Sequence, residues 1–367
     1  MKICILTSVH PVFDIRIFQK EAKTLARANY DVSLIAQHDK EEIVDRIKII
    51  PLLKPRNRLY RIFISPWFVF KKALKQKSDV YHFHDPELIP ISILLKYFVK
   101  NSKIIYDAHE DVSSDILVKN WIKNQKIRKI VSVIFRILEK LSCIFFDQII
   151  TVSEPIAKKF PSNKTTIIQN LPIIEKIENI SLAKIKKYKP VVIYAGGLNK
   201  VRGIKEIIQA IGLMNGKVEL WLFGDFKDKN IEKECKNTNG WQNTKYFGYT
   251  SQIKLYSYMK GADIGIINFL PMPHNTYGLP NKPFEYMTCS LPVIMSNFPY
   301  WQSFFENKVL YCRPDQPSDI AAKINYLLKN SEQRKKMIIE CKNMIIKKWN
   351  WKTQGDKLIK LYQKLLE

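Results

Sequence analysis

The sequence predicts an α/β protein made of two Rossmann-like domains, each with a doubly wound parallel sheet. Short runs of β-branched and aliphatic residues alternate with amphipathic helical segments, which is the pattern of successive βαβ units. This rhythm is interrupted once, at residues 171–189, and then begins again. A chain of 367 residues is also long enough for two domains of ordinary size.

Composition indicates two packed cores under a basic surface. Hydrophobic residues make up 46% of the chain and aromatic residues 12%, which is inconsistent with a largely disordered protein. The six cysteines show no C-x-x-C spacing, so we expect neither a disulfide framework nor a zinc cluster, and a reduced cytosol is the default compartment. Lys and Arg outnumber Asp and Glu by 60 to 34. Such a surface should attract phosphorylated substrates, anionic lipid or nucleic acid.

No targeting or membrane-spanning segment is expected. The apolar start at residues 3–6 is too short for the apolar region of a signal peptide. The longest apolar tract, residues 130–152, is interrupted by charged residues, which argues against a transmembrane helix. We therefore expect a soluble or peripheral protein.

The first domain is expected over residues 1–170. Its short β-branched runs predict strands at residues 2–7, 30–36, 46–53, 79–84, 103–108, 147–152 and 165–168. Amphipathic segments between them predict helices that include residues 15–28, 59–74 and 87–99. The loop after the first strand lacks G-x-G-x-x-G, so a dinucleotide fingerprint is absent.

Polar side chains gather where these strands end, which is where such folds bind ligands. The first loop carries His10, Asp14 and Arg16, although Asp14 as a helix cap and Arg16 as a solvated side chain are equally good interpretations. The sequence HFHD places His84 at the end of another strand. His109 follows the next strand directly and is therefore the stronger candidate for a functional role.

A metal site is the alternative for the same strand ends. His82 and His84 alternate onto one face of their strand, and with Asp107 and His109 they would resemble the site of a metal-dependent hydrolase. The pattern lacks any dedicated ligand spacing, so we expect no metal here. One of the two strand histidines is expected to be an ordinary core residue.

Two basic segments with interleaved aromatic or aliphatic residues suggest contact with a membrane surface. Residues 54–77 contain many Lys and Arg and no acidic residue, and residues 119–140 repeat the pattern with Glu139 as the one acid. Such helices favour an interfacial position on anionic lipid. Alternatively, each helix buries its apolar face in the protein core and exposes its basic face to solvent. Binding of nucleic acid by the basic residues is a further alternative.

A second domain is expected over residues 190–348, after a linker at 171–189 and before a C-terminal helix at 349–367 that can pack back on the N-terminal domain. The predicted strands are residues 190–195, 217–223, 245–248, 262–268, 291–295 and 309–311. The predicted helices include one that ends near residue 214 and those at residues 317–328, 331–347 and 351–366.

The turn after the first strand of this domain is typical of a phosphate-binding loop. Gly196 and Gly197 feed a helix, with Lys200 and Arg202 beside them. Later strand ends carry Gly224, and also Phe247 and Tyr249, which are placed to flank a base, although core packing is the commoner fate of such aromatics.

The segment from residue 275 to 297 predicts a donor-binding helix. Its loop contains Tyr277, Gly278, Leu279 and Pro280, and the helix begins at Asn281 with a proline in its first turn. Lys282 lies at the positive end of the helix dipole, which suits an anion bound there. Glu285 is placed to accept hydrogen bonds from two neighbouring hydroxyls, as on a ribose. The alternative is a surface helix with an ordinary Lys–Glu pair.

Taken together, these motifs resemble the glycosyltransferases of the GT-B fold in family 4, among the bacterial enzymes of capsule, O-antigen and cell-envelope polysaccharide assembly. The resemblance covers nearly the whole chain. The stretches that carry it, in the family's order, are residues 10–21 (HPVFDIRIFQKE), 106–110 (YDAHE), 150–154 (ITVSE), 194–203 (YAGGLNKVRG) and 279–294 (LPNKPFEYMTCSLPVI).

The resemblance implies two domains that face a cleft, with a nucleotide-diphosphate sugar held mostly by the second domain and the acceptor by the first. It implies that Glu285 holds the ribose hydroxyls and that His109 lies beside the transferred sugar. Arg202 stands where the family usually has a diphosphate-binding lysine, and a guanidinium is a competent replacement. On the acceptor side we expect His10, Arg16, His84 and Glu110.

Two positions depart from the family pattern. Tyr277 stands where the family's E-x7-E motif has its first glutamate, which leaves recognition of the sugar hydroxyls, and therefore the donor sugar, open. Gly197 stands where many members have an arginine, so Lys282 and Arg202 become the main partners of the diphosphate.

The resemblance further implies a retaining hexosyltransferase that needs no cofactor beyond its nucleotide sugar, with His109 or Asp14 as candidates for assisting proton transfer. We expect a glycan acceptor, with polyprenyl diphosphate as a candidate carrier, at the anionic inner face of the cell membrane, and no nucleic acid. An epimerase or hydrolase acting on sugar nucleotides, a metal-dependent hydrolase and a basic nucleic-acid-binding protein are the competing hypotheses.

Overall fold

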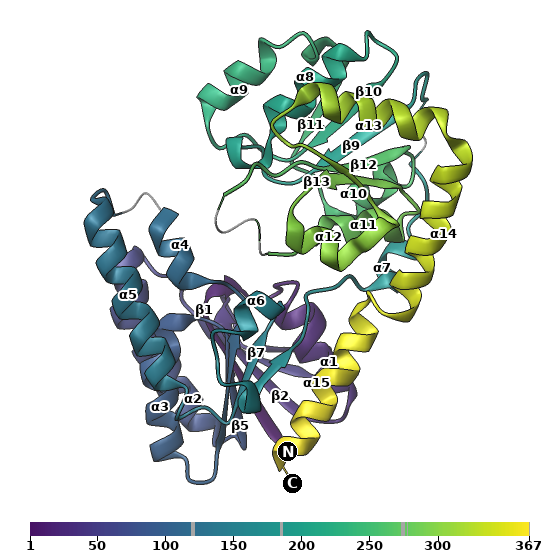
Figure 1. Ribbon diagram of the computed structural model, residues 1–367. Helices are drawn as coiled ribbons and strands as arrows, with labels where there is room; N and C mark the ends of the chain where they lie inside the picture. The colour runs from purple at the N-terminus through teal and green to yellow at the C-terminus, as the bar shows by residue number, and fades with distance from the viewer. Residues whose placement is uncertain (119–121, 184–185, 273–275, 277, 367) are drawn as a thin grey trace. The chain divides into compact units, whose positions relative to one another are not determined.

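A computed structural model describes residues 1–118, 122–183, 186–272, 276 and 278–366 (Figure 1). The chain forms two compact units. The first domain contains residues 1–170 together with the C-terminal segment that begins at Trp351, and the second contains Leu171–Asn350. Within the described residues, no helix combines the length and the apolar character needed to cross a bilayer.

The first domain is built on one eight-stranded sheet with the order β3-β4-β2-β1-β5-β6-β7-β8. Neighbouring strands are parallel except β3 and β4, which pair antiparallel at the edge. The strands are β1 (Lys2–Pro11), β2 (Asp31–Gln37), β3 (Glu42–Val44), β4 (Ile47–Leu52), β5 (Val80–Phe83), β6 (Lys103–Ala108), β7 (Gln148–Thr151) and β8 (Thr165–Ile167).

Helices cover both faces of this sheet (Figure 1). One face carries α2 (Ser65–Gln76), α3 (Ile89–Phe98) and α5 (Gln125–Ser142), and the other carries the π-helical segment η1 (Ile17–Ala22), α1 (Lys23–Arg27) and α15 (Trp351–Leu366). The indole Nε1 of Trp351 donates to Oγ1 of Thr24 at 2.9 Å, which ties α15 to α1. The shorter elements are η2 (Tyr60–Ile64), η3 (Pro86–Leu88), α4 (Val112–Val118), α6 (Glu154–Ala157) and η4 (Ser162–Lys164).

The second domain has a six-stranded parallel sheet with the order β11-β10-β9-β12-β13-β14. Its strands are β9 (Val191–Ala195), β10 (Glu219–Phe223), β11 (Thr244–Gly248), β12 (Ile264–Ile267), β13 (Val293–Ser296) and β14 (Leu310–Cys312). Its helices are α7 (Ile174–Glu178), η5 (Lys200–Arg202), α8 (Ile204–Leu213), α9 (Lys229–Lys236), η6 (Trp241–Asn243), α10 (Gln252–Met259), α11 (Lys282–Thr288), α12 (Pro299–Phe305), η7 (Glu306–Lys308), α13 (Pro317–Lys329) and α14 (Ser331–Lys347).

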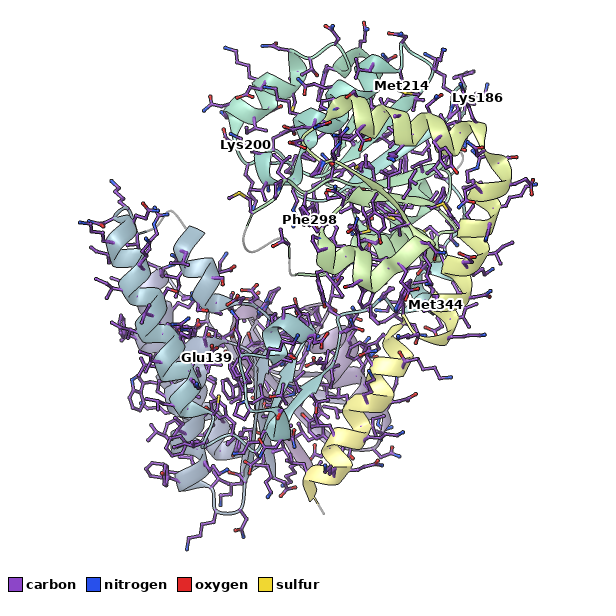
Figure 2. All side chains as sticks on the ribbon, viewed as in Figure 1. Glu139, Lys186, Lys200, Met214, Phe298 and Met344 are labelled. Carbon is purple, nitrogen blue, oxygen red and sulfur yellow. The ribbon has the colours of Figure 1, made fainter. Side chains whose placement is uncertain are left out.

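Alternating residues of this second sheet point into two cores, one on each face. Val192 and Leu220 pack with α8 and α13, whereas Val191 and Trp221 pack with α10, α11 and α12. Side chains fill the space on both faces, and Phe298 is buried among them while Lys186 lies at the surface (Figure 2). The predicted fold class, two α/β domains with parallel sheets, is confirmed.

The segment expected as a linker is partly built into the second domain. Within residues 171–189, α7 forms a short helix, and Leu171 and Ile177 are buried in the core beneath α11. The Lys- and Asn-rich composition of this stretch predicted an extended linker, but the stretch contains a short amphipathic helix.

Candidate active site

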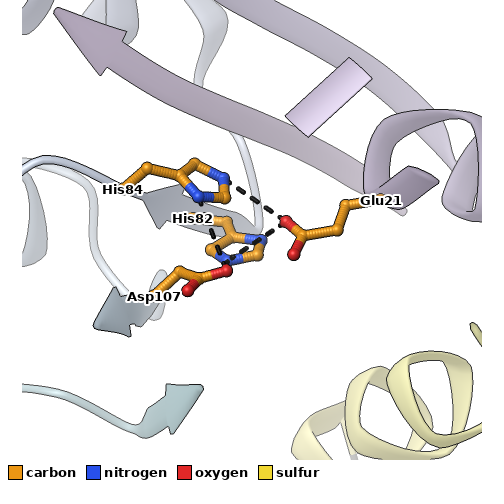
Figure 3. A group of neighbouring side chains, drawn as sticks. All are labelled: Glu21, His82, His84 and Asp107. Carbon is orange, nitrogen blue, oxygen red and sulfur yellow. Dashed lines mark ion pairs between the residues drawn. The ribbon is translucent and has the colours of Figure 1, made fainter. Parts of the chain in front are cut away.

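A buried group of charged and imidazole side chains lies in the first domain (Figure 3). Glu21 comes from η1, His82 from β5, His84 from the residue after β5, and Asp107 from β6. All four side chains are fully excluded from solvent. Because β5 and β6 are neighbours in register, with His82 opposite Ile105, residues near their carboxyl ends meet at one edge of the sheet.

Arg16 supplies the positive charge in this group. Its Nε and Nη2 donate to Oδ2 of Asp107 at 3.0 and 2.7 Å, and Nε also lies 3.1 Å from Oε1 of Glu21. Its Nη1 donates to the backbone carbonyl of Ile168 at 3.2 Å. The side chain is 5% exposed, so Arg16 is a buried structural cation and does not face an acceptor as expected.

The two histidines of the group are held by polar neighbours. Nε2 of His84 lies 3.4 Å from Oε2 of Glu21, and Nδ1 lies 3.5 Å from Oδ2 of Asp107. Nδ1 of His82 and the hydroxyl of Tyr362 from α15 form a hydrogen bond of 2.9 Å. His84 is thus buried, as His82 is, and does not present its ring to an acceptor.

Glu21, His82, His84 and Asp107 offer ligand atoms that lie within 4.8 Å of one another, which is a candidate arrangement for a metal ion. The group already contains the positive charge of Arg16 without one. Burial raises the pKa of Glu21 well above its ordinary value, which favours the protonated acid, and lowers the pKa values of both histidines, which favours their uncharged rings. Burial also disfavours ionised Asp107, but Arg16 outweighs it and holds the Asp107 pKa well below its usual range. Arg16 lies within ion-pair distance of both carboxyl groups, and we interpret the group as an ion cluster.

The partly open edge of this cluster carries two further histidines. The side chain of His109 is 16% exposed, and its Nδ1 lies 3.4 Å from Oδ1 of Asp107. The ring of His10 lies 5.7 Å from that of His109. His10 stands between two carboxylates, with Nε2 3.5 Å from Oδ1 of Asp85 and Nδ1 3.7 Å from Oδ2 of Asp14.

Asp14 has a capping role in the structure. Its Oδ1 accepts hydrogen bonds from the backbone N–H groups of Arg16 and Ile17 at 2.8 and 2.9 Å, at the start of η1. Burial raises the pKa of Asp14, but His10 and these two N–H groups outweigh it and lower the pKa to about 2. A carboxylate so stabilised is a weak base, which leaves His109 as the better of the two catalytic candidates. Glu110 is exposed beside it.

In the second domain, the turn after β9 is fixed by its own polar groups. The Tyr194 hydroxyl donates to the carbonyl of Gly197 at 3.1 Å, and Oδ1 of Asn199 accepts from the backbone N–H of Arg202 at 3.1 Å. Gly203 has a φ of +56°, and its carbonyl accepts from the buried amide of Asn268, which follows β12, at 3.2 Å. A Cβ at Gly203 would lie 2.4 Å from that amide, so only glycine fits.

This turn presents the guanidinium of Arg202 without a carboxylate partner. Its Cζ lies 3.9 Å from the centroid of the Phe269 ring, in a cation–π contact. Among the described residues, no Asp or Glu lies within ion-pair distance of it. Burial lowers the pKa of Arg202, although a guanidinium remains charged. An anion is the group that would complete this arrangement.

The helix α11 brings Lys282 and Glu285 to the same domain. Nζ of Lys282 lies 2.6 Å from Oε2 of Glu285, whose residue is 8% exposed. The hydroxyl of Tyr286 accepts from the backbone N–H of Ala195 at 3.0 Å, which ties α11 to the end of β9. The loop before α11 is tied too, since Nε1 of Trp301 donates to the carbonyl of Gly278 at 2.7 Å.

Two family models match the chain, one to each domain. "Glycosyltransferase Family 4" matches residues 17–170, and "Glycosyl transferases group 1" matches residues 175–344. The chain belongs to the GT-B glycosyltransferases of family 4. The predicted enzyme class is therefore confirmed: the protein is a glycosyltransferase.

Solved structures of other glycosyltransferases share the fold of this one. A sucrose-phosphate synthase of Thermosynechococcus elongatus aligns with a TM-score of 0.79 and 17% identity over 100% of this chain and 98% of that one. HepE of Anabaena, in complex with UDP, aligns with a TM-score of 0.73 and 14% identity over 99% and 100%. A UDP-forming trehalose-phosphate synthase of Burkholderia xenovorans, in complex with glucose-6-phosphate, gives 0.71 and 12% over 100% of both chains. No curated protein sequence matches this glycosyltransferase significantly.

The remaining donor-side candidates fall into three groups. Phe247 stacks on Phe223 at 4.5 Å with an interplanar angle of 3° and packs against the core, so it does not stand free to flank a base. Tyr249 is 81% exposed and does stand free. Gly224 is required by packing, because a Cβ there would lie 1.8 Å from the carbonyl oxygen of Gly196. Of the loop before α11, Gly278 and Asn281 are exposed, Leu279 and Pro280 are half-buried, and Tyr277 lies outside the described residues.

Sequence reasoning missed several residues that hold the glycosyltransferase's candidate site in place. Asn268 and Phe269 secure the turn that carries Arg202, and the rings of Phe269 and Trp301 lie 5.5 Å apart. Their only sequence signal is position, since Asn268 and Phe269 come directly after a strand that neighbours β9 in the sheet. Glu21 stands in the sequence only as the last residue of a family motif, and nothing local indicates its burial.

Proposed function

We propose that this enzyme transfers a hexosyl group from a nucleotide-diphosphate sugar to a hydroxyl of a saccharide acceptor, with retention of configuration and without a metal ion, in the synthesis of a bacterial surface polysaccharide. The proposal rests on the family and on the donor-side geometry of the second domain. One of the HepE structures is a complex with UDP and glucose, which makes a uridine diphosphate sugar a sensible first donor to test.

The observation that carries the proposal is the unpaired guanidinium of Arg202. A planar cation stacked on Phe269 and lacking a carboxylate partner among the described residues is suited to bidentate contact with a diphosphate. As the glycosidic bond breaks, negative charge grows on the leaving diphosphate, and a cation already in place stabilises that charge.

Lys282 and Glu285 give the donor its second anchor. In this structure the two side chains satisfy each other at 2.6 Å. A bound diphosphate would compete for the Lys282 ammonium, and the freed Glu285 carboxylate would accept hydrogen bonds from the two ribose hydroxyls. Without donor the two charges pair with each other, and with donor bound each of them has a partner on the ligand.

On the acceptor side we propose His109 as the residue beside the reacting sugar. It follows β6 directly and keeps part of its ring open to solvent, whereas His82 and His84 are enclosed. In a retaining transfer by same-face attack, the acceptor hydroxyl loses its proton on the side where the diphosphate leaves. The role of His109 is to hold a sugar hydroxyl in place by a hydrogen bond.

The acceptor is proposed to be carried on a lipid, with polyprenyl diphosphate as the candidate, because the first domain has an apolar outer surface rimmed by cations. On α5 the side chains that share one exposed stripe are Ile127, Ile130, Ile134, Ile137, Leu138 and Leu141. Lys129, Arg136 and Lys140 flank that stripe. A stripe of this kind fits an anionic membrane surface, with the apolar side chains in the interface and the cations among the headgroups.

The same surface continues over α2 and α3 through contacts between aromatic rings. Phe70 of α2 contacts Trp67 at 6.1 Å and Phe98 of α3 at 5.8 Å, and Tyr97 contacts Phe145 beyond α5 at 6.3 Å. Trp67, Tyr97 and Phe98 are each more than half exposed. Aromatic side chains of this kind favour the boundary between water and lipid.

A thermal-shift and transfer assay with uridine, guanosine and adenosine diphosphate sugars tests the donor proposal. A donor that binds only the folded protein raises its melting temperature, and Arg202→Ala or Glu285→Ala should abolish both that shift and the transfer. Lys205→Ala is the matched control, because Lys205 is a cation three residues further along the chain whose ammonium already pairs with Glu234 at 2.8 Å. Unchanged turnover in the Arg202 or Glu285 variant would exclude the proposed donor site, and release of free sugar without any acceptor would indicate a hydrolase.

A further inference from the structure

Asp107 and His109 carry two buried polar atoms that face each other. Oδ1 of Asp107 and Nδ1 of His109 lie 3.4 Å apart, and neither forms a hydrogen bond in the structure. A buried polar atom without a partner is uncommon and calls for a structural explanation, and here each of the two atoms lies close enough to the other to become its partner. Closure by a few tenths of an ångström would make this contact a hydrogen bond, and such bonds often tighten when substrate binds.

The other oxygen of Asp107 is already fixed. Oδ2 accepts from Nε and Nη2 of Arg16 at 3.0 and 2.7 Å, and Arg16 is itself held by Glu21 and by the carbonyl of Ile168. The guanidinium keeps the pKa of Asp107 well below its usual range in spite of burial, so this side chain is an ionised acceptor and cannot donate a hydrogen bond.

The ring of His109 can therefore form a hydrogen bond with Asp107 only as the donor. The imidazole must place its proton on Nδ1, and in the neutral ring Nε2 then carries the lone pair. No partner of Nε2 is found among the described residues. His10 offers a contrast, because carboxylates of Asp85 and Asp14 lie near its Nε2 and its Nδ1 respectively.

We propose that Asp107 is a positioning residue that holds His109 in the tautomer protonated on Nδ1, so that Nε2 accepts a hydrogen bond from a sugar hydroxyl. This inference rests on the proposed function, in which His109 lies beside the reacting sugar. It specifies the ligand chemistry, since the group that meets Nε2 must be a donor, as a hydroxyl is, and cannot be an anion such as a phosphate or carboxylate.

The first test measures the tautomer itself. In protein labelled with ¹⁵N only at histidine, the two ring nitrogens give separate shifts that distinguish the tautomers, and the His109→Gln variant identifies the signal. We expect wild-type His109 to carry its proton on Nδ1 at pH 8. In Asp107→Asn the amide oxygen should stay with Arg16, which places the NH₂ group against Nδ1 and moves the ring proton to Nε2. A wild-type ring protonated on Nε2 would overturn the proposal.

Glu21→Gln is the matched control. Glu21 contacts the same guanidinium from the same buried cluster, and glutamine has nearly the same shape as its side chain; burial raises the pKa of Glu21, which favours the protonated acid that glutamine resembles. We expect the His109 tautomer to be unchanged in this variant. A shift to Nε2 in Glu21→Gln as well would mean that any disturbance of the cluster moves the ring, which would contradict a specific role of Asp107.

Kinetics separate this inference from the proposed function. Asp107→Asn should lower kcat by about tenfold to a hundredfold, with a smaller change in KM for the donor. Losing the carboxylate that orients a metal-binding histidine has an effect of this size. In a double-mutant cycle, Asp107→Asn should cost nothing further when His109 is already alanine. Full activity of His109→Ala would refute the proposed role of His109, whereas an additional loss in the double variant would refute only the positioning role of Asp107. Melting temperatures of all variants show whether a loss of activity is due to unfolding.

Discussion

The guanidinium of Arg202 lies 3.9 Å from the centroid of the Phe269 ring, although the two residues follow different strands of the second domain. The sheet order explains the meeting, because β9 and β12 are neighbours and their carboxyl ends share one edge. The ring limits the orientations open to a long side chain, so less rotamer freedom is lost when an anion binds. The cation of the proposed donor site is thus oriented before a donor binds.

Replacing Phe269 with leucine should weaken donor binding while the cation remains. Loss of the cation–π contact is expected to cost about 0.5–2 kcal/mol, which raises the Kd of the nucleotide sugar by about 2-fold to 30-fold. Isothermal titration calorimetry measures this directly. Phe304→Leu is the control, because Phe304 stacks on Trp349 at 5.4 Å within the same domain and has no contact with Arg202. Equal losses of affinity in both variants would indicate a general effect on folding.

Gly203 should tolerate alanine far less than Gly248 does. Both glycines have a positive φ, +56° and +66°, so any L-residue costs about 1–2 kcal/mol of strain at either position. At Gly203 the added Cβ also lies 2.5 Å from the backbone oxygen of Asn268, whereas at Gly248 it meets nothing within 4 Å. Thermal unfolding should therefore show a clearly larger loss of stability for Gly203→Ala. Equal losses would mean that the Asn268 contact adapts without cost.

Much of the fold follows from local sequence pattern. The run KIIYDA predicts the strand at residues 103–108, and the structure has Lys103–Ala108; the predicted helices at 331–347 and 351–366 also have the observed bounds. Strand period and helix period are properties of neighbouring residues, so single stretches reveal them. The short antiparallel edge strand Glu42–Val44 was missed, because three residues carry too little pattern.

The candidate site was predictable only where one short motif contains it. Lys282 and Glu285 lie three residues apart on one helix, and their pairing can be seen in the sequence. The contact between Arg16 and Asp107 spans 91 residues, and that between Tyr362 and His82 spans 280. No local rule reports such contacts, so the sequence pattern places Arg16 and His84 on an open acceptor surface although tertiary packing buries them.

Glu139 should make the protein less stable as pH rises from about 4.5 to neutrality. Burial on the inner side of α5 raises its pKa from 4.5 to about 7, and its carboxyl lies 2.8 Å from the Tyr106 hydroxyl. The folded state therefore holds a proton that the unfolded state releases above pH 4.5. Stability due to this proton is complete below about pH 4.5, falls between about pH 4.5 and 7, and ends about 3 kcal/mol lower.

Glu139→Gln isolates this effect, because glutamine mimics the protonated acid and still accepts from Tyr106. We expect the variant and the wild type to have similar melting temperatures at pH 4.5, and the variant to be the more stable at pH 8. Other titrating groups are the same in both proteins and cancel in the comparison. A difference that is independent of pH would show that Glu139 does not titrate in this range.

Chelators should leave transfer activity unchanged. Arg16 already pairs with the ionised Asp107 of the buried cluster, so a divalent ion there would meet an adjacent guanidinium in a dry site. Elemental analysis of protein purified without added metal should find less than one ion per chain. One equivalent of metal that is retained by the wild type and lost in His84→Ala would contradict the ion-cluster interpretation and favour a metal centre.

Vesicle binding should depend on the apolar stripe of α5. Ile134 and Ile137 are each 51% exposed, and transferring such a side chain from water to an apolar medium is worth about 1.5–3 kcal/mol. Replacing both with glutamate should therefore lower the partition onto vesicles of phosphatidylglycerol and phosphatidylcholine by more than about tenfold. Co-sedimentation measures the bound fraction. Binding of the wild type should also fall with rising salt and on vesicles without the anionic lipid, because the flanking cations act through screened charge.

The matched control is the same pair of substitutions on a helix of the second domain. Ile339 and Ile346 of α14 are 62% and 53% exposed, so Ile339→Glu with Ile346→Glu changes net charge and surface hydrophobicity by similar amounts. This control should bind vesicles as the wild type does. An equal loss of vesicle binding in both double variants would show that the added negative charge alone weakens binding. Unchanged binding of the α5 variant would show that α5 does not contact the vesicle. A change in oligomeric state without a change in vesicle binding would instead assign the stripe to contact between copies of the chain.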